Sequence, residues 1–106
     1  MLKVEKKKQK FQAHIEVEMT IYNASELKKK FMPLMDETHD LVVNLSKVTE
    51  IDSAGVQLLM LLKKERAIRG KTLTLIDHSN TVLDVFELIG LVTYFSDPVV
   101  LPKGKI

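Results

Sequence analysis

The chain has 106 residues and a formal net charge of +2, with 45% hydrophobic and 28% charged residues. This size and composition are typical of one globular domain with its own core, so we expect a single domain over residues 1–106. The sequence contains no cysteine, which excludes disulfides and thiolate metal sites. It also lacks a membrane-spanning apolar run and the apolar core of a signal peptide. These features predict a cytoplasmic protein without direct membrane insertion.

The positive charge is concentrated at the N-terminus. The first ten residues contain one acid, Glu5, and five lysines, namely Lys3, Lys6, Lys7, Lys8 and Lys10. The rest of the chain has 11 basic and 13 acidic residues. Lysines on an exposed strand deter edge-to-edge pairing, and no arginine or aromatic residue is interleaved with these. We therefore interpret the stretch as a solvated edge strand and expect no nucleic-acid partner.

The first half of the chain predicts two strands and a helix. Residues 2–5 alternate weakly between apolar and polar side chains, and residues 11–19 alternate strictly, which is the strongest strand signal present. Asn23 followed three places later by Glu26 predicts a helix N-cap with a capping box. Pro33 is expected to kink that helix or end it.

The remaining elements follow from shorter patterns. We expect a buried strand at residues 41–45, a helix at 54–69 closed by Gly70, a strand at 72–76, a helix from about Val82 to Gly90, and at least one short strand in residues 92–95 or 99–101. The order β-β-α-β-α-β-α-β predicts an α/β fold. Its mixed sheet has four to five strands, with helices packed mainly on one face.

A small polar cluster precedes the most apolar helix. Asp52, Ser53, Ala54 and Gly55 stand directly before an almost unbroken apolar run. Either Asp52 or Ser53 can cap the helix by accepting from its first N–H groups. A helix N-terminus favours negative charge, so a hydroxyl at Ser53 is well placed to carry a phosphate. The alternative is that both residues act only as caps.

Conventional catalytic patterns are not found. The histidines His14, His39 and His78 lack metal-ligand spacing, and the four glycines are scattered singly. Asp52 alone would not activate Ser53 as a nucleophile. We therefore expect no enzyme, with no catalytic residue, metal or cofactor.

The residues around Ser53, in this element order, resemble the STAS domain family, which includes the bacterial anti-sigma factor antagonists. The resemblance spans roughly residues 11–95 and is carried by residues 18–24, 41–45, 48–55 and 86–91. Stand-alone STAS proteins of bacterial chemotaxis and signalling systems look most similar, because they share the Thr-Ile-Tyr and Asp-Ser-Ala-Gly motifs. The resemblance implies the STAS fold over the whole chain.

In anti-sigma factor antagonists the serine of this motif is phosphorylated by a partner serine kinase, often the anti-sigma factor itself, and a phosphatase reverses the reaction. The resemblance implies that Ser53 is the phosphorylated residue. The expected partners are such a kinase, or a chemotaxis-type signalling protein, and a serine phosphatase. The expected docking surface comprises Asp52, Ser53, Gly55, Val56 and Asn23, with the loop at residues 77–79 beside it.

The sequence is compatible with two roles for Gly55 and with a second function. Gly55 either lets a partner's backbone or a neighbouring strand approach closely, or packs the helix start tightly. Ala54 stands where many antagonists have serine or threonine. Asp-Ser/Thr-Ala-Gly also resembles the motif of STAS subunits in lipid-transport complexes. The alternative function is therefore a constitutive STAS subunit of a transporter.

Overall fold

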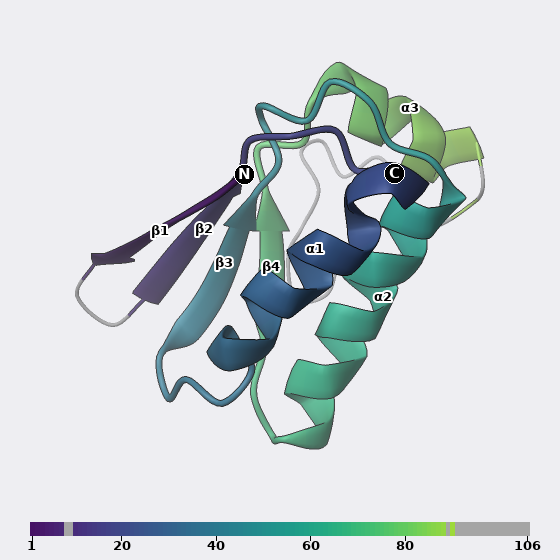
Figure 1. Cartoon of the computed structure of the whole chain (residues 1–106). Helices are drawn as coiled ribbons and strands as arrows, with labels where there is room; N and C mark the ends of the chain where they lie inside the picture. The colour runs from purple at the N-terminus through teal and green to yellow at the C-terminus, as the bar shows by residue number, and fades with distance from the viewer. Residues whose placement is uncertain (8–9, 89, 91–106) are drawn as a thin grey trace.

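A mixed sheet with helices on one face forms the frame of the molecule (Figure 1). The structure is a computed structural model that describes residues 1–7, 10–88 and 90. Its elements, in order, are β1 (Leu2–Lys7), β2 (Lys10–Ile15), α1 (Ile21–Phe31), the 3-10 helix η1 (Met32–Leu34), β3 (Asp40–Asn44), α2 (Ser53–Ile68), β4 (Leu73–Ile76) and α3 (Asn80–Leu88).

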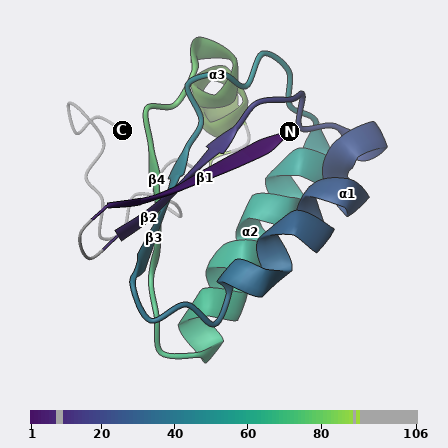
Figure 2. The same ribbon diagram turned by 60° about the vertical axis from the view of Figure 1, so that its left-hand side comes forward.

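The described strands lie in the order β1-β2-β3-β4. The first pair is antiparallel with Leu2 opposite Ile15 and Lys7 opposite Lys10, whereas β2–β3 and β3–β4 are parallel. Both parallel connections move one strand in the same direction across the sheet. Crossovers of one hand then place α1 and α2 on the same face, where Figure 2 shows them side by side. The α/β STAS fold class is confirmed, while the expected final strand falls on residues outside the described part.

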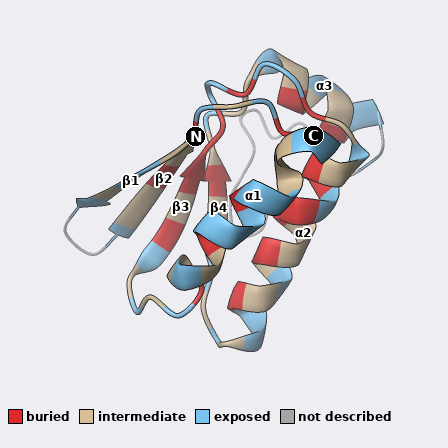
Figure 3. Ribbon diagram, viewed as in Figure 1, coloured by how far each residue is buried: buried red, intermediate tan, exposed pale blue. Residues whose placement is uncertain are grey.

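Strand alternation separates the two faces of the sheet. Alternate residues such as Ala13, Val43 and Leu75 are buried beneath the helices, because successive side chains on a strand point to opposite faces. The helices contribute Leu27 and Phe31 from α1, and Leu58, Leu59 and Leu62 from α2. Figure 3 shows buried positions on the strands and on α1 and α2.

Two expected boundaries in the first half are wrong. The alternating run at residues 11–19 is not one strand, because β2 ends at Ile15 and Met19 forms an isolated parallel bridge with Ile51. Asn23 is not an N-cap. Helix α1 begins before it, and Thr20 caps the helix by accepting from the Tyr22 N–H. The expected effect of Pro33 is confirmed, since α1 ends at Phe31 and the chain continues as η1.

Arg66, in the last turn of α2, is a charged residue that is only 1% exposed. Its guanidinium donates to five backbone carbonyls, those of Thr72 (2.9 Å), Leu34 (3.4 Å), Met35 (3.1 Å), Glu37 (2.8 Å) and His39 (2.9 Å). A buried charge is tolerated when its donors are satisfied in this way. Arg66 therefore ties the end of α2 to the segment between α1 and β3.

Candidate functional site

Ser53 is the first residue of α2, and its side chain is exposed. The cap of this helix is Asp52, whose Oδ1 accepts from the N–H groups of Ala54 (2.9 Å) and Gly55 (3.2 Å). Of the two caps that the sequence allowed, the structure selects Asp52. The Ser53 hydroxyl therefore does not form the cap, and it stands at the surface of a helix N-terminus.

The Asp52 carboxylate also holds the start of α1. Its second oxygen, Oδ2, accepts from the Ile21 N–H at 3.0 Å. Partial burial acts to raise the pKa of the Asp52 carboxyl, but the backbone N–H groups that donate to it outweigh this and hold the pKa below its ordinary value. One ionised side chain thus joins two helix N-termini around Ser53.

Backbone hydrogen bonds also join the segment that precedes α1 to the segment that precedes α2. The Met19 N–H donates to the Glu50 carbonyl at 2.8 Å, and the Asp52 N–H donates to the Met19 carbonyl at 3.1 Å. A Cβ placed on Gly55 would lie 2.1 Å from the Met19 oxygen and 2.9 Å from Ile51 Cγ1. Only glycine fits there, so the structure favours the tight-packing role of Gly55 over an approach by a partner.

Two members of the expected docking surface lie inside the fold. Val56 is 3% exposed and Gly55 is also buried, because both lie on the face of α2 that packs into the core. They position Ser53 and present little surface to a partner. Asn23 is half-buried within α1 and donates to the Glu18 carbonyl at 2.9 Å.

Two surface residues that the sequence reasoning did not assign lie beside Ser53. Ile21 and Tyr22, in the first turn of α1, are 68% and 91% exposed, and the Asp52–Ile21 hydrogen bond places that turn next to the start of α2. Large exposed apolar side chains often mark interaction sites. The signal was missed because α1 was expected to begin at Asn23, which left Ile21 and Tyr22 outside any expected element.

The side chains of the loop at residues 77–79 make contacts within the fold. Asp77 Oδ2 accepts from Asn44 Nδ2 at 3.0 Å, and Ser79 Oγ accepts from the Val82 N–H at 3.2 Å. Burial lowers the pKa of the His78 imidazole. The loop therefore holds β3, β4 and α3 together, and these contacts do not include Ser53.

The groups near Ser53 do not favour nucleophilic catalysis. A carboxylate that already accepts three N–H groups, with a lowered pKa, is a weak base for activating a neighbouring hydroxyl. Within residues 1–7, 10–88 and 90, no group of three or more histidine or acidic side chains is arranged to hold a metal ion. None of the helices described is both long and apolar enough to cross a bilayer.

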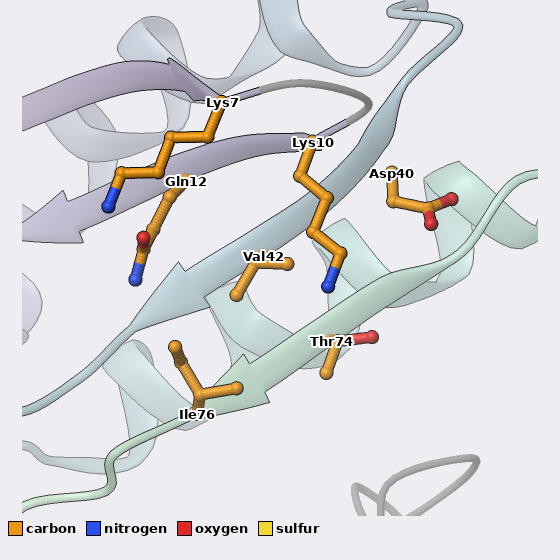
Figure 4. A pocket seen from close by; sticks show the side chains of 7 residues that line it. All are labelled: Lys7, Lys10, Gln12, Asp40, Val42, Thr74 and Ile76. Atoms are coloured by element: carbon orange, nitrogen blue, oxygen red, sulfur yellow. The ribbon is translucent and has the colours of Figure 1, made fainter.

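The surface has hollows on both sides of the sheet. One, of about 270 Å³, lies on the face turned away from α1 and α2 (Figure 4). It is lined by Lys7, Lys10, Gln12, Asp40, Val42, Thr74 and Ile76. Lys7 and Lys10 come from the ends of β1 and β2 that face each other, and the apolar Val42 and Ile76 come from β3 and β4. A second hollow lies between α1 and α2 and begins next to Ser53 at Ala54.

Comparisons with known proteins agree with this geometry. The family model described as "Mlab, STAS domain" matches residues 2–101. An anti-sigma-B factor antagonist of Staphylococcus epidermidis is 32% identical over 75 residues, which cover 70% of this chain and 69% of that protein. That relative is named as a regulator, in agreement with the expectation that the chain is not an enzyme.

Solved structures share the fold. The unphosphorylated form of the anti-sigma factor antagonist SpoIIAA aligns with a TM-score of 0.72 at 18% identity, over 89% of this chain and 84% of that one. The phosphorylated form of the Bacillus cell fate determinant SpoIIAA aligns with a TM-score of 0.66 at 18% identity, over 89% and 87%. The chain therefore belongs to the STAS domain family, as an anti-sigma factor antagonist-like member.

Proposed function

We propose that this protein is a cytoplasmic protein-binding module switched by phosphorylation of Ser53. Its partner is a serine kinase of the anti-sigma factor type or a related signalling protein, and a serine phosphatase resets it. The observation that carries the proposal is the exposed Ser53 hydroxyl at a rigid helix start, beside the exposed Ile21 and Tyr22. The named function of the Staphylococcus relative and the phosphorylated form of SpoIIAA support it.

A phosphate on Ser53 would act at the surface. It adds about −1.5 to −2 charges and three acceptor oxygens. The Ala54 and Gly55 N–H groups already bind the Asp52 carboxylate, so these two donors are not free to neutralise the phosphate. The added charge therefore faces an approaching protein, while the Asp52 contacts that hold the fold remain in place.

The test compares partner binding by Ser53→Ala and Ser53→Asp. The matched control is Thr38→Asp, which adds the same charge at an exposed site between η1 and β3, at the opposite end of the helices. The three variants and the wild type are used in quantitative pull-downs against the serine kinases encoded by the host. We expect Ser53→Asp to lose at least tenfold in affinity for its kinase, with Ser53→Ala and Thr38→Asp unchanged. Equal binding by all four proteins contradicts the switch.

The second candidate is a constitutive subunit of a transporter. The Asp-Ser-Ala-Gly motif at residues 52–55 favours this function, because Ala54 replaces the serine or threonine of many antagonists. This function requires no phosphorylated form, and it predicts that Ser53→Asp binds its transporter ATPase as the wild type does. Co-purification of the ATPase with both proteins, and no phosphate on Ser53, would establish it.

A further inference from the structure

A groove of about 480 Å³ lies between α1 and α2. Its walls are Ala24, Ser25 and Lys28 from α1, and Ala54, Gln57, Leu58 and Leu61 from α2. Residues three and four apart share one face of a helix, so each set forms a continuous wall. Ala54 directly follows Ser53, and the groove therefore opens at the candidate phosphorylation site.

The groove combines an apolar interior with one charge. Leu58, 5% exposed, forms its floor, and Leu61 and Ala24 are half-buried at its sides. Six of the seven lining residues are uncharged, and the seventh is Lys28. In the described part of the chain, no ion pair joins Lys28 to an acid, and the single acid of α1, Glu26, lies 3.9 Å from Lys29.

We propose that this groove binds an acidic amphipathic helix of the partner protein. An apolar side chain of that helix packs on Leu58 and Leu61, and a carboxylate one turn away faces Lys28. Laying the apolar face of a helix into such a groove is a common mode of recognition. The proposal rests on the proposed function and deepens it by naming the chemistry of the partner segment.

The acidic character of the segment makes phosphorylation an off-switch. A phosphate on Ser53 would stand at the mouth of the groove, where it repels a carboxylate-bearing helix. A basic segment would instead be attracted by the phosphate, and phosphorylation would then strengthen binding. Attraction to Lys28 and release on phosphorylation therefore both require a negatively charged partner segment.

Cross-linking identifies the segment directly. A photoreactive amino acid replaces Gln57, an exposed groove residue, and in a matched control replaces Lys30, an exposed residue of α1 that does not line the groove. After irradiation of living host cells, mass spectrometry sequences the cross-linked peptide. We expect an acidic, amphipathic peptide from Gln57 and not from Lys30. A basic peptide, a lipid, a nucleic acid or no product at Gln57 overturns the proposal.

Titration of the identified peptide, made synthetically, tests the role of Lys28. Lys28→Glu should weaken binding at least tenfold, whereas Lys30→Glu, the same charge reversal on the same helix, should change it less than twofold. Equal effects of the two variants overturn the groove. If Lys28→Glu weakens binding and Ser53→Asp does not, the groove stands and the proposed switch fails. The reverse pattern retains the switch and rejects the groove.

Discussion

Replacing Gly55 with alanine tests how closely the start of α2 packs against Met19. The added Cβ would lie 2.1 Å from the Met19 carbonyl oxygen and 2.8 Å from Met19 Cβ, whereas ordinary contact begins at 3.4 Å. The Met19 backbone would have to retreat by more than an ångström. That carbonyl accepts the Asp52 N–H, and the Met19 N–H donates to Glu50, so the retreat weakens both hydrogen bonds.

The cost follows from three terms. Overpacking of this kind costs about 1–3 kcal/mol, and two weakened hydrogen bonds cost about 1 kcal/mol each. Alanine regains about 1 kcal/mol of helix propensity. The Gly55→Ala protein should therefore unfold with a free energy about 2–4 kcal/mol lower than the wild type, a large share of the roughly 5–15 kcal/mol of a small domain.

Urea unfolding followed by far-ultraviolet circular dichroism measures this loss, with the m-value checked for constancy. The control is Ala54→Gly, which removes a Cβ at the adjacent position and should cost only about 1 kcal/mol of propensity. A Gly55→Ala protein as stable as the wild type, or more stable, would refute the close approach of Met19.

The other predictions concern Asp52 and Arg66. In Asp52→Asn the new amide has one oxygen acceptor in place of two and keeps the cap of only one helix, so the variant should lose about 1 kcal/mol at pH 7. Because the Asp52 carboxyl pKa is lowered in the folded state, its contribution is complete above the unfolded pKa of about 3.9 and is lost as the pH falls through the folded pKa. The two proteins should therefore converge in stability below about pH 4 in urea titrations. Arg66→Met leaves buried carbonyls without donors and should cost about 3 kcal/mol or more in the same assay. Arg66→Lys, which keeps the charge but has fewer donors, should lose less.

Specific outcomes would contradict these predictions. A constant difference between wild type and Asp52→Asn from about pH 3 to pH 7 would show that the Asp52 carboxylate does not stabilise the helix starts through its charge. An Arg66→Met protein as stable as Arg66→Lys would show that the carbonyl contacts of Arg66 add little. Lys64→Met, at an exposed position of the same helix, is the matched control for removing a basic residue.

Patterns local to one element were predicted well. The apolar run at residues 41–45 became β3, and the polar cluster before Val56 became the start of α2. Gly70, expected to close that helix, follows its C-cap with a φ of 71°, a backbone conformation that glycine adopts without strain. Each of these signals depends on a few neighbouring residues, so the sequence contains all the necessary information.

Features that depend on distant partners were missed. Asn23 and Glu26 formed an acceptable capping box, but Asp52 binds the Ile21 N–H and lets α1 begin earlier. The polar residues around Arg66 in the sequence predict an exposed side chain, whereas in the fold the carbonyls of the segment after α1 surround it. The burial of Val56 and the exposure of Tyr22 follow from the same packing of α1 against α2. The position of Ser53 was predictable, whereas the surface around it was not.

The state of Ser53 in cells decides whether the protein is a phosphorylation switch. The tagged protein is isolated from its host under conditions that block phosphatases, in several phases of growth, beside a Ser53→Ala control. Mass spectrometry of the peptide that spans residues 48–63 then counts phosphates. We expect one phosphate on Ser53 in a fraction of the wild-type molecules and none on that peptide of the control. An unmodified Ser53 in every condition would contradict the switch.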